Sequence, residues 1–99
     1  MVKVIWTKRS LEDLKDIGDF ISKDSFHYAR LTLTKIINTD DLISNNPKIG
    51  RIVPEINDEN IREIIKGNYR IIYQIRKKRT SLILTVFHSS RLLSRESLE

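Results

Sequence analysis

The chain has 99 residues, of which 39% are hydrophobic, and its 18 Lys or Arg against 13 Asp or Glu give a net charge of +5. This length suffices for one hydrophobic core and is too short for two, so we expect a single domain over residues 1–99. The few glycines and prolines disfavour a disordered or fibrous chain, and the lack of cysteine excludes disulfides, thiol nucleophiles and thiolate metal sites.

The first residues predict a β-strand, because Val2, Val4 and Trp6 alternate with residues on the other face. This start lacks the basic, apolar and cleavage regions of a secretory signal, and no apolar run approaches the ~18 residues that cross a bilayer. We therefore expect a cytoplasmic protein without membrane contact. The final Leu98 and Glu99 resemble a remnant of an expression tag and carry no weight.

Two helices are predicted next, joined by a four-residue connection that requires them to run antiparallel. Thr7 is the expected N-cap of the first helix, and Asp24 or Ser25 that of the second. The apolar stripe of the second helix comprises Phe26, Ala29, Leu33, Ile36 or Ile37, and Ile43. From both helices, the residues expected to face inward are Leu14, Ile17, Ile21, Leu33 and Ile37.

Pro47 and Gly50 end the second helix, and residues 51–60 read as a loop. Strands are predicted over 61–66, 69–76 and 81–88, with Gly67-Asn68 as a two-residue hairpin turn and 77–80 as a second turn. In the middle strand, Tyr69, Ile71, Tyr73 and Ile75 form the inward face, which places Arg70 and Arg76 on the open face of the sheet. The last strand alternates Leu82, Leu84, Val86 and His88 against Ile83, Thr85 and Phe87, and since it is apolar on both faces we expect it to be central.

The element order βααβββ predicts an α+β fold of two layers, with an N-terminal strand and an antiparallel helical hairpin packed on an antiparallel sheet.

Positive charge is concentrated in the C-terminal part of the chain. Residues 61–99 hold nine Lys or Arg against three Glu, a net +6, whereas residues 1–60 have a net charge of −1. Such segregation indicates a polyanion or an acidic polypeptide as the binding partner.

The chain resembles the RelE/ParE superfamily of toxins from bacterial type II toxin–antitoxin systems. The resemblance rests on the βααβββ order and on four segments: 46–50 (NPKIG), 61–64 (IREI), 68–73 (NYRIIY) and 86–93 (VFHSSRLL). It covers nearly the whole chain, from about Val4 to Leu93.

This resemblance implies one of two activities. RelE-like members cleave mRNA in the ribosomal A site with a cluster of basic residues, so their partners are the ribosome and mRNA. ParE-like members poison DNA gyrase and are not known to be enzymes. Both branches are neutralised by a cognate antitoxin whose acidic and apolar tail wraps around the toxin.

Carried onto this sequence, the resemblance assigns functional arginines to Arg70 and Arg91, and Arg62 is near the place of a basic residue in RelE. The strand before Arg70 lacks the alternating lysine pair of RelE, and no tyrosine follows Arg91. The ending from His88 to Leu92 is more similar to the ParE branch. We therefore favour a ParE-like toxin, with a RelE-like endoribonuclease as the alternative.

In the endoribonuclease reading, the catalytic candidates are Arg62, Arg70, Arg91 and His88. The arginines would stabilise the pentavalent phosphate, and His88 or Glu63 would be the base. Glu63 is more easily read as an ion-pair partner of a neighbouring arginine, and His88 as an ordinary polar residue at a strand end.

The candidates for contact with the target or the antitoxin are Arg62, Arg70, Arg76 and Arg91. A structural role for Arg70 remains an equal alternative, and the run from Arg76 to Arg79 is also typical of a solvated hairpin tip. No cofactor is implied. No metal site is expected, because His27 and His88 lie far apart in the sequence without an acidic cluster at ligand spacing.

Overall fold

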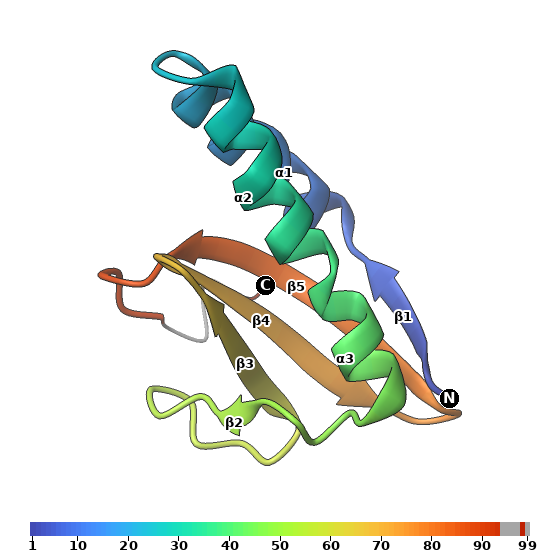
Figure 1. Cartoon of the computed structure of the whole chain (residues 1–99). Coiled ribbons are helices and arrows are strands. Elements are labelled where there is room, and N and C mark those ends of the chain that lie inside the picture. Colours follow the sequence, from blue (N-terminus) through green and yellow to red (C-terminus); the bar gives the residue numbers. More distant parts are fainter. Residues whose placement is uncertain (94–97, 99) are drawn as a thin grey trace.

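The computed structural model of the protein describes residues 1–93 and residue 98. In chain order its elements are β1 (Lys3–Trp6), α1 (Lys8–Ser22), α2 (Phe26–Ile37), α3 (Thr39–Asn45), β2 (Arg51–Ile52), β3 (Ile61–Lys66), β4 (Tyr69–Arg76) and β5 (Thr80–His88). Figure 1 shows α1 and α2 as a hairpin whose tip extends beyond the sheet, with α3 lying across the sheet. The predicted α+β architecture is confirmed.

Local interactions explain where the helices and turns begin. Thr7 accepts a hydrogen bond from the backbone N–H of Ser10 (3.2 Å), and Ser25 accepts one from that of Tyr28 (3.1 Å), so both are side-chain N-caps. Gly67 has φ +56°, a conformation that glycine adopts readily in a two-residue hairpin turn. The predicted caps at Thr7 and Ser25 and the predicted turn are therefore confirmed.

The predicted second helix is in fact two helices. Asn38 separates α2 from α3, and the buried Thr39 hydroxyl donates to the carbonyl of Ile36 at 2.6 Å. Such a bond from a threonine hydroxyl to a preceding carbonyl competes with the helical ladder and bends the chain. A two-residue strand, β2, also lies inside the segment that was expected to be a loop.

The sheet has the strand order β1-β5-β4-β3-β2 and is mixed rather than wholly antiparallel. β1 pairs with β5 in parallel, from Lys3 opposite Thr80 to Trp6 opposite Ile83, and the other pairs are antiparallel. A parallel pair requires a long crossover, which the intervening helices and strands supply. β5 lies between β1 and β4, as its two apolar faces predict.

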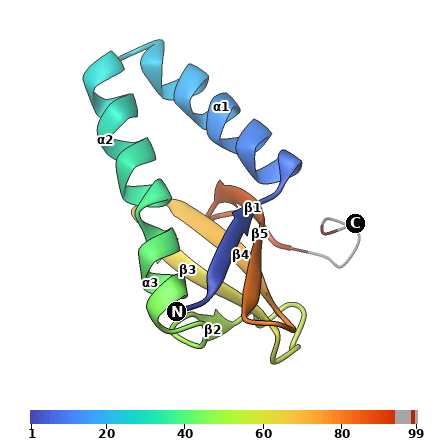
Figure 2. The ribbon, with the colours of Figure 1, turned by 90° about the vertical axis from the view of Figure 1, so that its right-hand side faces the viewer.

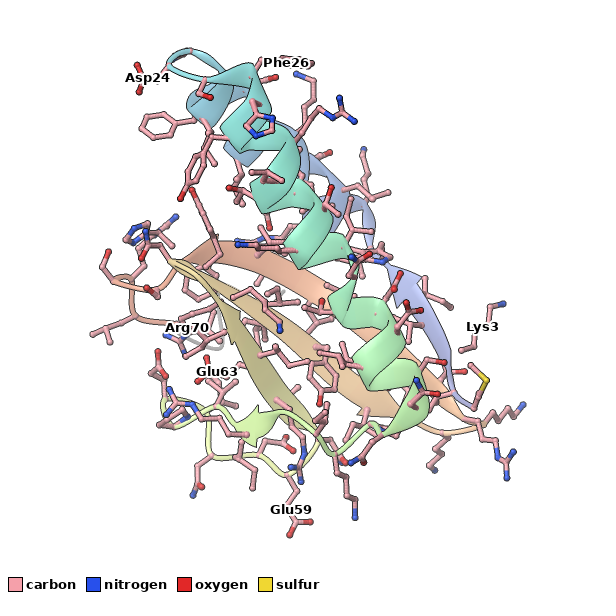
Figure 3. All side chains as sticks on the ribbon, viewed as in Figure 1. Lys3, Asp24, Phe26, Glu59, Glu63 and Arg70 are labelled. Carbon is pink, nitrogen blue, oxygen red and sulfur yellow. The ribbon has the colours of Figure 1, made fainter. Side chains whose placement is uncertain are left out.

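The first core lies between the helices and the sheet (Figure 2). Its buried members are Leu14, Ile36, Ile43, Ile71, Tyr73, Ile83 and Val86. Tyr69 and Ile75 pack against it, which confirms the predicted inward face of β4. Two predictions were wrong, because Phe26 is 72% and Ile37 43% exposed. Phe26 lies at the hairpin tip, beyond the sheet (Figure 3), and Ile36 instead of Ile37 faces the core.

A second core covers the opposite face of the sheet and is formed by Val53, Ile56, Ile61, Ile72 and Leu93. It forms because residues 53–56 return alongside β3, where the backbone N–H of Val53 donates to the carbonyl of Ile61 at 3.1 Å. Leu98 packs against this cluster, whereas Glu99 lies outside the described residues. The prediction that this face is open was therefore wrong.

A β-bulge changes which residues of β5 face the helices. Ile72 is opposite Thr85 but Tyr73 is opposite Ile83, so Leu84 is the extra residue. Ile83 and Val86 consequently share the helix-facing side, and the simple alternation predicted for residues 82–88 was wrong. The carboxylate of Asp13 in α1 accepts hydrogen bonds from the Thr85 hydroxyl and the Val86 backbone N–H at this bulge. Among the residues described, no helix is long and apolar enough to span a bilayer.

Candidate functional site

Two arginines and two glutamates gather on the face of the sheet opposite the helices, and we call Arg51, Glu55, Glu63 and Arg70 the arginine–glutamate cluster. Glu63 on β3 and Arg70 on β4 point to this face (Figure 3), and the Arg70 Nε donates to Glu63 Oε1 at 2.6 Å. Arg51 donates to the other oxygen of the same carboxylate. Two positive and two negative side chains leave this cluster with no net formal charge.

Glu55 forms the remaining ion pair of Arg70. It belongs to residues 53–56, which lie over this face of the sheet and which we call the covering segment. The two terminal nitrogens of Arg70 donate to the two carboxylate oxygens of Glu55 at 2.6 and 2.9 Å, a bidentate pair. Arg70 Nη1 also donates to the carbonyl of Arg91 at 3.0 Å, and Glu55 accepts the backbone N–H of Leu93 at 2.9 Å. Arg70 and Glu55 thus hold the chain after β5 against the sheet.

Burial and pairing set the ionisation of this cluster. Arg70 is 5% and Glu63 1% exposed. Hydrogen bonds from Arg70 lower the pKa of Glu55 from its ordinary 4.5 to about 2. The pKa of Arg70 is raised, mainly by its hydrogen bonds to Glu55. Arg70 and Glu55 are therefore charged at neutral pH, and a phosphate reaches the Arg70 guanidinium only if a carboxylate leaves it.

Arg70 and Arg91 come together beside the ring of Phe87 on β5. The guanidinium carbons lie 5.3 Å (Arg70) and 5.9 Å (Arg91) from the ring centroid, within the range of cation–π attraction. Arg91 is exposed, whereas Arg70 lies beneath the covering segment. The sequence thus correctly grouped the two arginines, but the expectation that Arg70 lies on an open face was wrong, because Glu55 and the second core cover it.

Arg62 and Arg76 lie apart from Arg70 and Arg91. Arg62 is adjacent to Glu63 on β3 and therefore points to the opposite face of the sheet. There its guanidinium donates to the carbonyls of Glu59 (2.9 Å) and Gly50 (3.0 Å), so it fastens two loops. Arg76 is exposed, six residues beyond Arg70 on β4, which corresponds to about 20 Å of strand.

His88 ends β5 as an exposed side chain. Its Nδ1 lies 2.8 Å from the Ser90 hydroxyl and accepts the backbone N–H of Ser90 at 3.2 Å. The imidazole also meets the edge of the Tyr69 ring, with centroids 5.8 Å apart. These contacts fit an ordinary polar residue that closes a turn. The expected role of Glu63 as an ion-pair partner is confirmed by its bonds to Arg51 and Arg70.

The sequence did not identify Glu55 or the partnership of Phe87 with both arginines. Glu55 lies in an irregular segment, where no periodicity reports which way a side chain points. Its acidic character near a basic strand was the one available signal. Phe87 is half-buried against the second core.

An aromatic groove of about 420 Å³ lies between the helical hairpin and the β3–β4 turn. Phe20, Tyr28 and Leu31 line its helical side, and Tyr69 and His88 line its sheet side. Phe20 is 69% and Tyr28 58% exposed, an unusual number of uncovered aromatic atoms for so small a chain. Lys35, Lys66 and Asp24 also line the groove, so its charged rim is positive overall.

Within residues 1–93 and 98, no group of three or more His, Asp or Glu side chains is arranged to hold a metal ion. What the exposed surface does offer is a cationic end of the sheet and an apolar groove with a positive rim. Both suit association with acidic macromolecules.

Comparison with known proteins gives a match to one family model. Residues 4–93 match the model described as ParE toxin of type II toxin-antitoxin system, parDE. Comparison with curated protein sequences gives no match. Among solved structures, a chain of the chromosomal ParDE toxin–antitoxin system from P. aeruginosa superposes with a TM-score of 0.70 at 16% identity, covering 89% of this chain and 96% of that chain. A chain of the toxin–antitoxin complex RelBE2 from Mycobacterium tuberculosis gives a TM-score of 0.62 at 21% identity, covering 88% and 96% respectively. At these identities the two structures establish a shared fold.

Proposed function

The chain belongs to the ParE family of toxins from type II toxin–antitoxin systems, and we propose that it arrests growth by poisoning DNA gyrase without being an enzyme. The observation that carries this proposal is the saturation of Arg70. Arg70 is 5% exposed, and its guanidinium is bonded to Glu55, Glu63 and a backbone carbonyl. A nuclease needs unoccupied cations aimed at the phosphate that develops charge in the transition state.

The other candidates for RNA cleavage are also poorly placed for that reaction. Arg62 lies on the opposite face of the sheet and is bonded to loop carbonyls. Arg91 is exposed, but a single cation beside His88 is a weak means of stabilising a pentavalent phosphate. These placements favour a toxin that acts by binding its target protein.

A supercoiling assay with purified gyrase tests this proposal. We expect the full chain to inhibit supercoiling and to trap cleaved DNA, and the antitoxin to reverse both effects. The alternative, a RelE-like mRNA endoribonuclease, predicts new mRNA 5′ ends within translated codons after expression of the toxin. Codon-positioned cuts together with unaffected gyrase at excess toxin would refute the gyrase proposal.

We further propose that the cognate antitoxin places an acidic amphipathic segment in the aromatic groove. The exposed Phe20, Tyr28 and Leu31 supply apolar contact area, and Lys35 and Lys66 attract acidic side chains. Folding of such a segment on binding is compatible with this pairing of apolar and cationic groups.

Serine substitutions on the hairpin test the groove, because Phe20 lines it whereas the equally exposed Phe26 does not. Phe20→Ser is expected to weaken antitoxin binding by at least tenfold, as measured by calorimetry, and to raise the antitoxin dose needed to restore growth. Phe26→Ser is the matched control and should bind as the parent does. Equal affinities of the two variants would exclude the groove.

A further inference from the structure

Five cationic side chains gather at the end of the sheet farthest from Arg70, and we call them the cationic tip. Four of them are consecutive at the β4–β5 turn, from Arg76 to Arg79, and the fifth is Lys3 on the adjoining β1. All five are exposed, and the backbone N–H of Lys3 donates to the carbonyl of Arg79 at 2.8 Å. Figure 3 shows the Lys3 side chain pointing away from the fold at this end.

Within residues 1–93 and 98, no acidic side chain forms an ion pair with a cation of the tip. In the described part of the chain, ion pairs engage Lys8, Lys15, Arg51 and Arg70 instead. Arg76 is oriented by a hydrogen bond to the side-chain oxygen of Gln74 (3.3 Å). The tip therefore presents up to five positive charges to solvent, as many as the net charge of the whole chain.

The backbone conformation of the turn is unusual for the residues that it carries. Lys78 has φ +58° and Arg79 φ +52°, in the left-handed region that glycine and asparagine favour and that other residues occupy rarely. The turn thus carries long cationic side chains at two positions where glycine or asparagine would fit with less strain. Tight hairpin turns often require this conformation at their central residues, and it also occurs at binding sites.

The chemistry of the tip selects the kind of partner. Its five residues carry no aromatic ring on which unpaired bases would stack, so single strands are disfavoured. An amphipathic acidic peptide needs exposed apolar anchors. The apolar residues that line the depression beside the tip, Ile75 and Leu82, are half-buried, and the most exposed aromatic side chains lie at the helical hairpin. The tip is therefore poorly suited to such a peptide. A dense row of phosphates needs exposed cations alone.

We propose that the cationic tip binds the phosphate backbone of duplex DNA, independently of base sequence. The tip lies about 20 Å along β4 from Arg70 and Arg91. DNA binding there is therefore a separate contact, in addition to the proposed action on gyrase. It would hold the chain on DNA through charge, with counterion release as the source of affinity.

A salt series with a short fluorescent duplex tests the proposal by anisotropy. The tip variant combines Lys77→Gln with Lys78→Asn and Arg79→Asn, because asparagine tolerates positive φ and the fold is kept. The matched control carries Lys23→Gln, Arg30→Gln and Lys48→Gln, which remove the same charge from exposed positions that form no ion pair within the described residues. For three lost phosphate contacts, the slope of log affinity against log salt should fall by about 2.7 in the tip variant and stay unchanged in the control.

Equal loss of slope in both triple variants would mean that net charge alone attracts DNA, and would overturn the proposal. Tighter binding of poly-glutamate or of single-stranded DNA than of the duplex would overturn it as well. If circular dichroism finds the tip variant unfolded, Lys77→Gln alone, at a position of ordinary φ, should still lower the slope by about 0.9. An unchanged slope in that single variant would contradict the proposal.

Discussion

Replacement of Arg70 by methionine is expected to destabilise the folded protein strongly, because it leaves carboxylates without their partner. Methionine fills much of the volume of the arginine stem but cannot donate a hydrogen bond. Glu63, which is 1% exposed, would keep only its bond to Arg51. Glu55 would lose its bidentate partner.

The expected loss is about 3–5 kcal/mol, the usual cost of removing one member of a buried ion pair. A domain of this size has an unfolding free energy of about 5–15 kcal/mol, so the loss takes a large share of it. At roughly 4–8 °C per kcal/mol, the midpoint of thermal unfolding should fall by about 12–40 °C. The loss should be larger at neutral pH than near pH 2, because Glu55, whose pKa is about 2, carries its charge at neutral pH.

Urea unfolding followed by the fluorescence of Trp6, the single tryptophan, measures this loss directly. Arg91→Met is the matched control, because Arg91 is exposed and its contact with Arg70 is made by the backbone carbonyl. We expect the control to change stability by less than about 0.5 kcal/mol. A double variant with Arg70→Met and Glu63→Met should recover part of the loss, since both buried charges are then removed together.

A loss below about 1 kcal/mol for Arg70→Met would refute this reasoning. It would mean that water or a rearranged Arg51 satisfies the two carboxylates, and that the covering segment does not depend on Arg70. In that case the guanidinium would also be free to serve a ligand, and the argument against phosphate binding at this position would fail.

Three further substitutions or conditions are predicted from the same contacts. Gly50→Ala should lower the unfolding free energy by about 1–3 kcal/mol in urea, because a Cβ there would lie 2.6 Å from the backbone carbonyl oxygen of Glu63. Glu55 has a pKa of about 2 in the folded chain against an ordinary 4.5. Its contribution to the unfolding free energy is therefore complete above pH 4.5 and is lost as the pH falls toward 2. In a plot of unfolding free energy against pH, Glu55→Gln should flatten the curve between pH 4.5 and pH 2. Asp13→Ala removes two hydrogen bonds to β5 and should cost about 1.5–3 kcal/mol by urea unfolding, and no loss would contradict the inferred role of this carboxylate at the bulge.

Local patterns predicted most of the helices and strands and the inner face of β4, but they missed the break at Asn38 and the two-residue strand β2. The alternation from Tyr69 to Ile75 identified the helix-facing side, since each of its apolar residues lies two positions from the next. Thr7, Ser25 and Gly67 were identified from chemistry that acts over three or four residues. The family resemblance named Arg70 and Arg91 together, and both guanidinium groups lie beside the ring of Phe87.

The failures share a physical cause, because each depended on contacts between distant parts of the chain. Arg70 reads as an outward residue until the segment around Glu55 is known to return over the sheet. The position of the β5 bulge is fixed by Asp13, more than seventy residues earlier, and cannot be found from the alternation of residues 82–88. Phe26 reads as a core residue until the hairpin is seen to extend beyond the sheet (Figure 1).

A role in toxicity must therefore be tested differently for the ion-paired Arg70 and for the exposed Arg91. Loss of toxicity in an Arg70 variant would report the folding of the covering segment as much as contact with a target, because the same guanidinium bonds Glu55, Glu63 and the Arg91 carbonyl. An Arg91 variant removes an exposed side chain and leaves that carbonyl in place. Toxicity lost with Arg91→Ala at unchanged stability would place the target at this end of the sheet, whereas toxicity that follows stability across a series of Arg70 variants would identify Arg70 as a structural residue.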